Sequence, residues 1–202
     1  MSQKVAQLRR GRKPAGWDEK TNAGRYGDRP CFSRVSLKAE LEERGEWFAY
    51  GGLALAHGLA KRLGLDGEID ERVRVLRLHL PYLESDHVLT HTYNLYVGGE
   101  RIEDIANLQG SVGTKKLVGS EWFPDPTTAG DFLRRFDRRA LEALQEAIDA
   151  GRQKVWKRLP KRKRKQATVD LDSHIKEVYG ECKRGADFSY DGRWSYHPLV
   201  AT

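Results

Sequence analysis

Hydrophobic positions in the first half of the chain recur at helical spacing. Leu55, Leu59 and Leu63 lie four residues apart and predict the apolar stripe of a helix that ends at Gly64. The following stretch, residues 68–77, predicts a second short helix. The chain therefore enters a helical region near residue 52.

Three further short helices are predicted after Pro81. Ser85 is a candidate N-cap for the first of them, and residues 101–109 form the second. Asp125 lies between two prolines and is the candidate N-cap of the third, which runs to Phe136. The first of these helices has one predicted inward face, made by Val88, Leu89, Thr92, Leu95 and Tyr96.

A longer helix is predicted to start at Asp137 and to continue toward Trp156. Its expected inward side chains are Leu141, Leu144 and Ile148. Its helical pattern weakens in a run of lysine and arginine residues.

The periodicity changes to that of β-strands after residue 166. Residues 167–172 alternate between apolar and polar, and residues 188–190 are joined to 194–199 by Asp191-Gly192, a favoured hairpin turn. Residues 33–50 fit a helix or a hairpin, and their alternation favours the hairpin. The expected fold is mainly α, followed by the first strands of a sheet that so few strands cannot complete.

Composition places the chain among soluble, ordered proteins. Of its 202 residues 39% are hydrophobic and 32% are charged, and no apolar run approaches the roughly 20 residues of a membrane span. Two cysteines, Cys31 and Cys182, are too few for a disulfide scaffold and fit reduced thiols. We expect a cytoplasmic location with no membrane partner.

Positive charge is concentrated in two short segments. Residues 1–13 hold five basic and no acidic side chains, and residues 152–166 hold nine basic and no acidic ones. Clustered cations of this kind suit a polyanionic partner, because they release counterions from phosphate backbones. The alternative is that both segments are simply solvated. The candidate contacts to double-stranded DNA are Arg9, Arg10, Arg12, Lys13, Lys161, Arg162, Lys163, Arg164 and Lys165.

These features divide the chain into four expected regions. They are a flexible basic arm (1–30), a mainly helical DNA-binding region (31–151), a basic linker (152–166) and the start of a β-containing domain (167–202). The arm contains an Arg-Gly-Arg string similar to those that enter A·T-rich minor grooves.

Asp170 and Asp172 are the candidate residues for chemistry. They lie two apart on a predicted strand, so both carboxylates project from one face, directly after the most basic segment. Hard Mg²⁺ ions take oxygen ligands, and two such ions clamp the attacking and leaving oxygens in phosphoryl transfer. One strand supplies too few ligands for a site, and surface carboxylates on an edge strand are the simpler interpretation.

Several motifs in the chain, in this order and spacing, are similar to one group of DDE-type insertion-sequence transposases. The resemblance covers roughly residues 50–202. Its motifs are Gly-Leu-Ala-Leu at 52–55, Arg-Leu-Gly-Leu at 62–65, Arg-Ile-Glu-Asp-Ile at 101–105, Pro-Asp-Pro-Thr-Thr at 124–128, Phe-Leu-Arg-Arg-Phe at 132–136, Val-Asp-Leu-Asp-Ser at 169–173, Val-Tyr-Gly-Glu at 178–181 and Tyr-His-Pro-Leu at 196–199.

The resemblance implies an incomplete RNase H-like α/β domain whose first strand carries the first acid of an Asp-Asp-Glu triad. Asp172, followed by Ser173, is assigned that role and Mg²⁺ ligation, with Asp170 as the reserve. His174 departs from the threonine that is more usual there. The second Asp and the Glu of the family lie beyond Thr202, so we expect a transposase fragment that binds DNA but neither cleaves nor joins it alone.

The same resemblance implies that the helical region recognises the ends of a mobile element. The helix from Ile102 to Leu108, a turn, and the helix from Thr127 to Phe136 predict a helix-turn-helix-like pair. Thr127, Thr128, Arg134 and Arg135 are then available to phosphates or base edges. Alternatively, Arg134, Arg135, Arg138 and Arg139 form only a solvated helix face.

Other interpretations remain open at this point. One rival is a non-catalytic DNA-binding regulator or inhibitor of transposition, and another is an RNA-binding protein, which no RNA-recognition signature supports. His87 and His91 have a zinc-compatible spacing but fit ordinary helix-surface residues better. Cys182 with His174 and His197 is a weaker metal set. The oligomeric state is open, a homodimer included.

Overall fold

The computed structural model describes residues 30–36, 49–77, 81–165, 168–180 and 183–201. The chain divides into two compact units, Met1–Lys157 and Arg158–Thr202. The predicted basic arm, with Arg9, Arg10, Arg12 and Lys13, lies outside the described residues.

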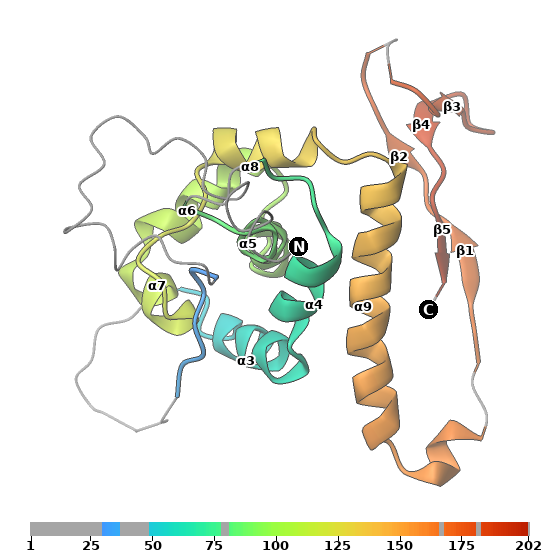
Figure 1. Cartoon of the computed structure of the whole chain (residues 1–202). Coiled ribbons are helices and arrows are strands. Elements are labelled where there is room, and N and C mark those ends of the chain that lie inside the picture. The colour runs from blue at the N-terminus through green and yellow to red at the C-terminus, as the bar shows by residue number, and fades with distance from the viewer. Residues whose placement is uncertain (1–29, 37–48, 78–80, 166–167, 181–182, 202) are drawn as a thin grey trace, which may run out of the picture. The chain divides into compact units, whose positions relative to one another are not determined.

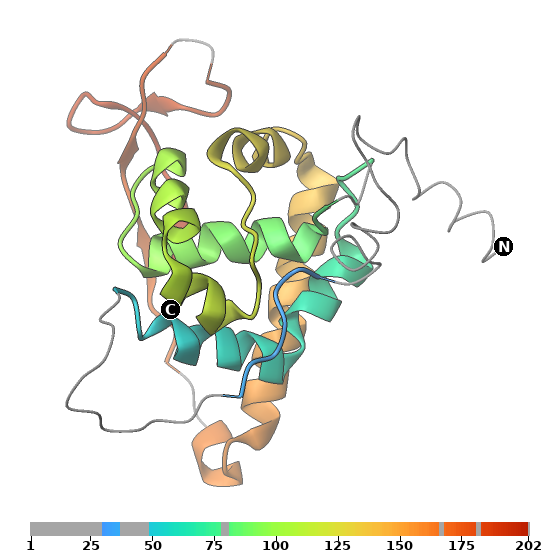
Figure 2. The same ribbon diagram turned by 90° about the vertical axis from the view of Figure 1, so that its left-hand side faces the viewer.

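The first unit is helical in the part of the chain that the structure describes. Its elements are α3 (Leu53–Leu63), α4 (Leu65–Arg72), α5 (Glu84–Tyr96), the 3-10 helix η1 (Ile102–Asp104), α6 (Ile105–Gly110), α7 (Val112–Val118), α8 (Pro126–Leu133) and α9 (Arg138–Arg158). Helix α5 passes through the middle of this unit and packs on α4, α6 and α8 (Figures 1 and 2).

Helix α3 ends at Gly64 as predicted, but its inward face is a different one. Gly64 adopts φ 63°, the left-handed conformation that glycine tolerates best at a helix end. The buried residues of α3 are Leu53, Ala54, His57, Ala60 and Lys61. The predicted stripe was therefore wrong, since Leu55 and Leu59 are 76% and 54% exposed.

The helices on either side of Pro81 also differ from the prediction. Helix α4 covers residues 65–72 rather than 68–77, and the chain is extended at Val73. Ser85 is not an N-cap; it lies inside α5, where its backbone N–H and hydroxyl donate to Asp70 at 2.8 and 2.9 Å. Asp86 instead accepts from the backbone N–H of Leu83, which holds the first turn of α5.

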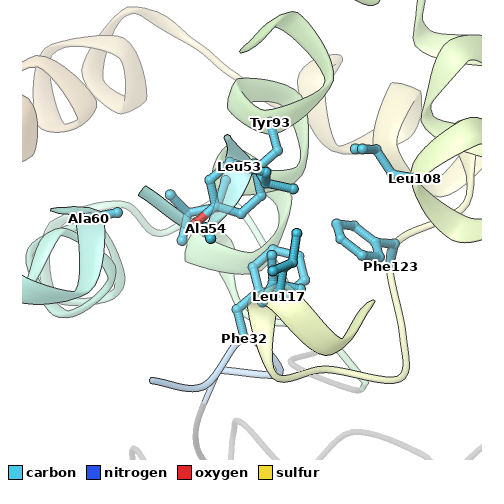
Figure 3. Close-up of a cluster of buried hydrophobic side chains, with 10 residues drawn as sticks. Phe32, Leu53, Ala54, Ala60, Tyr93, Leu108, Leu117 and Phe123 are labelled. Atoms are coloured by element: carbon cyan, nitrogen blue, oxygen red, sulfur yellow. The ribbon is translucent and has the colours of Figure 1, made fainter. Parts of the chain in front are cut away.

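The larger of two hydrophobic cores gathers around α5. Phe32, from the amino-terminal segment, lies against Tyr93 and Phe123, with ring centroids 5.7 and 4.9 Å away (Figure 3). Leu89 and Tyr93 point inward from α5, whereas the predicted inward residues Leu95 and Tyr96 are mostly exposed. The core is completed by Leu53, Ala54, Ala60, Leu108, Leu117 and Val118.

A smaller core joins α9 to α4. Ile69, Val73 and Ala147 are fully buried, and Leu144 packs against them as predicted. Leu141 and Ile148 do not, being 52% and 43% exposed. The buried residues of α9 are Ala140, Ala147 and Gly151, because small side chains let two helices approach closely.

The second unit contains η2 (Lys161–Arg164) and short strands. They are β1 (Leu171–Ser173), β2 (Lys176–Glu177), β3 (Asp187–Phe188), β4 (Trp194–Tyr196) and β5 (Leu199–Ala201). All pairings are antiparallel: β1 with β5, and β4 between β2 and β3.

Strands β1 and β2 form one ribbon with β4 and β5. Asp172 pairs with Val200 and Lys176 with Tyr196, so one continuous register runs through both ladders. His174 N–H still donates to the carbonyl of Pro198 at 3.0 Å. Because Pro198 has no N–H to return a bond, the ladder is interrupted there.

The hairpin between β3 and β4 forms as predicted, with a longer loop. Ser189 N–H donates to the carbonyl of Arg193, so Tyr190, Asp191 and Gly192 form the loop. Gly192 has φ 78°, which is typical of a type I turn followed by a left-handed residue.

The coarse fold class is confirmed: a mainly helical region precedes a few antiparallel strands. The proposed hairpin at 33–50 falls largely on residues 37–48, outside the described residues, and the described positions 33–36 and 49–50 form no strand. Within the described ranges, no helix combines the length and apolar character of a membrane span.

Candidate nucleic-acid interface

The basic segment at 152–165 is built from a helix end and a short 3-10 helix. Its first part is not a linker, because α9 continues through Arg158. Pro160 then ends the α-helical path, and 161–164 form η2. Every side chain from Lys161 to Lys165 is exposed.

Two cations of this segment have carboxylate partners. Arg152 pairs with Asp149 one turn earlier on α9. Lys154 donates to Glu68 and to the carbonyl of Leu63, both at 2.7 Å, and so ties α9 to the preceding helices. The hydrogen bond from Lys154 is the main reason why the pKa of Glu68 is lowered.

The other cations of the segment have no such partner in the part of the chain that the structure describes. Among the described residues, no carboxylate pairs with Lys157, Arg158 or residues 161–165. Their charges are exposed and available to an external anion. The predicted contacts Lys161, Arg162, Lys163, Arg164 and Lys165 are thus brought together on one short stretch.

A second group of arginines lies at the corner between α8 and α9. Arg134 pairs with Asp131 at 2.6 Å and Arg138 with Glu142 at 3.0 Å, each on the exposed surface. Arg135 and Arg139 form no ion pair with any carboxylate that the structure describes. Exposed pairs of this kind contribute roughly 0–1 kcal/mol, so phosphate can displace them.

The two threonines predicted to contact DNA have different roles. Asp125 caps α8, as predicted, accepting from the N–H of Thr128 at 3.0 Å. The hydroxyl of Thr128 also donates to Asp125 and lowers the pKa of that carboxyl. Thr128 therefore has its hydroxyl occupied, whereas Thr127 is exposed.

The predicted helix-turn-helix pair is not formed as expected. The connection from α6 to α8 is not a turn, because α7 (Val112–Val118) and an irregular segment intervene. Helix α8 packs on η1 and α5. Helix α7 was not predicted from the sequence, although Ser111 is a capping residue that accepts from the N–H of Thr114 at 3.1 Å.

The paired histidines are part of the protein interior, not of its surface. His87 is 3% exposed and stacks on Phe132, with ring centroids 4.4 Å and planes 9° apart. His91 is partly buried and its Nε2 lies 3.1 Å from the carbonyl of Ala129. Burial lowers the pKa of His87 to about 4 and lowers the pKa of His91. These rings join α5 to α8.

The two carboxylates proposed for chemistry lie on the exposed ribbon of the second unit. Asp172 belongs to β1 and accepts from the N–H of Ser173 at 2.8 Å, and Asp170 immediately precedes the strand. Both are exposed.

No metal site is assembled in the part of the chain that the structure describes, where no three His, Cys, Asp or Glu side chains come together. His174 and His197 cannot form the weak set considered above. In the ribbon's register His174 is opposite Pro198, so the two histidines project from opposite faces. Cys182 lies outside the described residues.

An acidic cluster that the sequence did not indicate lies where α4 meets α5. Glu84 and Asp86 are buried there, and Asp70 beside them is half-buried. Burial raises the pKa of Asp70 to about 6, although the bonds from Ser85 oppose this shift. No sequence signal pairs residues so far apart. The backbone N–H groups of Phe32 and Leu83 donate to Asp86, and that of Leu76 donates to Glu84.

Comparisons with family models, with curated proteins and with solved structures found no match to this chain.

Proposed function

We propose that the chain binds double-stranded DNA through its basic segment at 152–165, as the DNA-binding portion of a DDE-type transposase. One observation carries the proposal. Lys157, Arg158 and residues 161–165 are exposed cations with no described carboxylate partner, on a stretch of sequence without an acidic residue.

The physics of the duplex explains why such a stretch favours DNA. Each phosphate neutralised by a lysine or arginine releases a condensed counterion, and log K falls with log salt concentration by about 0.9 per contact. Cations already held by carboxylates contribute less, because the existing pair must first be broken. Lys154, held by Glu68, is such a case.

The transposase part of the proposal is supported by the motif resemblance alone. Asp172 would supply one Mg²⁺ ligand from β1. The described residues do not bring the other ligands to it. The proposed parent activity, cleavage and joining of DNA ends, thus has no complete site here, and we derive no catalytic step.

A non-catalytic DNA-binding regulator of transposition is the alternative. The exposed, unassembled carboxylates at 170 and 172 favour it, because DNA binding needs no metal ligand. Both proposals share the same basic segment. They differ in whether Asp172 matters.

The test measures the affinity of the full chain for a labelled duplex, by fluorescence anisotropy at a series of salt concentrations. The variant Arg162→Ala, Lys163→Ala, Arg164→Ala, Lys165→Ala should reduce the slope of log K against log salt by about 2 to 4. A matched variant, with Arg134, Arg135, Arg138 and Arg139 changed to alanine, removes the same charge at the α8–α9 corner.

The matched variant tests whether binding is specific to the basic segment. Equal losses in the two variants would contradict that specificity, because they fit either a net-charge effect or phosphate contacts at the α8–α9 corner. A salt-independent affinity of the unmodified chain would reject the proposed DNA binding altogether.

A further inference from the structure

Trp156 is an exposed aromatic side chain within the basic end of α9. Its side chain is 57% exposed, and among the described residues it makes no hydrogen bond or ring contact. Tryptophan is highly buried on average, and its ring dominates the energetics of interfaces when it is covered. The ring of Trp156 thus offers a large apolar face to a ligand.

The position of Trp156 on the helix rules out a role in the core. With about 3.6 residues per turn, Trp156 projects from the side of α9 opposite the buried Ala147. Arg152 precedes it by one turn on the same side, and Lys157 follows it directly. Both are exposed.

The charge around the ring indicates the chemistry of the partner. No acidic residue occurs between Asp149 and Asp170, while the sequence after Trp156 is dominated by lysine and arginine. A planar aromatic side chain among cations is the combination that binds single-stranded nucleic acid, where bases stack on rings while cations hold the backbone.

We infer that Trp156 is a stacking platform for an unpaired base, so that the end of α9 binds single-stranded DNA or the unpaired end of a duplex. Bases inside a duplex already have both faces stacked on their neighbours. The ring therefore distinguishes unpaired from paired DNA, which the surrounding cations alone do not. This inference rests on the proposed binding of DNA by the basic segment.

The experiment measures anisotropy of the full chain with three labelled probes. They are a single strand of about 12 nucleotides, the duplex of the same sequence, and that duplex with an unpaired overhang. The variants are Trp156→Leu, which keeps apolar volume but loses the ring face, and Trp156→Phe, which keeps a ring. Leu141→Ala, at an exposed apolar position earlier on α9, is the control.

We expect Trp156→Leu to weaken binding of the single strand and the overhang by roughly 5- to 100-fold. Duplex affinity and the salt slope should stay unchanged, because no charge is removed. Trp156→Phe should recover most of the affinity, and Leu141→Ala should behave as the unmodified chain. Circular dichroism of each variant confirms that the helices are retained.

Two results would overturn the inference. One is that Trp156→Leu binds the single strand as tightly as the unmodified chain. If that variant also lost self-association, the ring would instead belong to a protein–protein interface. The other is an equal loss on all three probes. If the unmodified chain binds the duplex with the expected salt slope, the proposed function holds even when the inference about Trp156 fails. If the chain does not bind the duplex, both the proposed function and the inference fail.

Discussion

The ring of His87 lies parallel to that of Phe132, with planes 9° apart and centroids at 4.4 Å. This stack joins α5 to α8. The Nδ1 atom of His87 is buried and has no hydrogen-bond partner among the described residues. The position therefore accepts a neutral ring and penalises a charged one.

Acid should destabilise the protein through His87. Burial lowers its pKa from 6.5 to about 4, so between these values the unfolded chain binds the proton first and stability falls as the pH falls. Replacement by phenylalanine should remove up to about 3 kcal/mol of this loss at pH 4. Urea unfolding at several pH values measures it.

Phe132→Leu is the comparison for this experiment. It removes the stacked ring but keeps the titrating group, so we expect a loss of about 1 kcal/mol at pH 7, where His87 is neutral, and a pH slope that is retained in part. An unchanged pH slope in His87→Phe would contradict the assignment of the acid sensitivity to His87.

Asp70 should destabilise the protein as the pH rises, the opposite of the effect of His87. Burial raises its pKa from 3.8 to about 6, so its contribution to stability is present below pH 4 and is lost as the pH rises through 6. Asp70→Asn keeps an oxygen to accept from Ser85 and removes the charge. It should raise the free energy of unfolding at pH 7.5 by about 1–3 kcal/mol and leave it unchanged at pH 3.5.

Ser85→Ala tests the same site from the other side. Loss of the hydroxyl that donates to Asp70 at 2.9 Å should cost about 1.5–3 kcal/mol at pH 7.5, where the carboxylate is charged, and less at pH 3.5. If Asp70→Asn were destabilising at pH 7.5, the charge of Asp70 would be stabilising rather than strained.

Two glycine positions, Gly151 and Gly119, should respond oppositely to replacement by alanine. At Gly151 an added Cβ meets only Leu65 Cδ1 at 3.7 Å, an ordinary contact, so Gly151→Ala should stabilise α9 by about 0.5–1 kcal/mol. At Gly119 the backbone has φ 61° and an added Cβ lies 2.7 Å from Val35 Cγ2. Gly119→Ala should cost about 1–3 kcal/mol. Thermal unfolding of the two variants side by side measures both, and the same sign of change in both would contradict the packing described.

Local signals in the sequence predicted element ends better than they predicted packing. Asp125 caps α8, Gly64 ends α3 and Gly192 closes a hairpin because each acts on backbone groups within a few residues. The same is true of the basic segment. Its exposure follows from its composition, since a run of cations has no way to be buried.

The buried face of each helix could not be predicted from hydrophobic periodicity alone. Helix α9 exposes Leu141 and Ile148, whereas Ala147 packs on Ile69 of α4 and Gly151 lies next to Leu65. His87 is buried because Phe132, far along the chain, covers it. Lys154 was one of the nine basic residues counted at 152–166, and its partner Glu68 lies far away in the sequence, in α4.

Asp172 provides the last prediction, because it separates catalysis from binding. Its carboxylate is exposed on β1 and, among the described residues, accepts only from the N–H of Ser173. Asp172→Ala should therefore leave duplex affinity within about twofold, with or without Mg²⁺, and should leave the salt slope unchanged, because removing an acid takes away no phosphate contact. The alanine variants of Arg162, Lys163, Arg164 and Lys165 serve as the positive control in the same assay.

In Mg²⁺ the chain should leave a labelled duplex uncut, because the described residues assemble no set of ligands around Asp172. Cutting that depends on Mg²⁺ and disappears in Asp172→Ala would overturn this prediction and would favour a transposase that is active as it stands over a regulator that only binds.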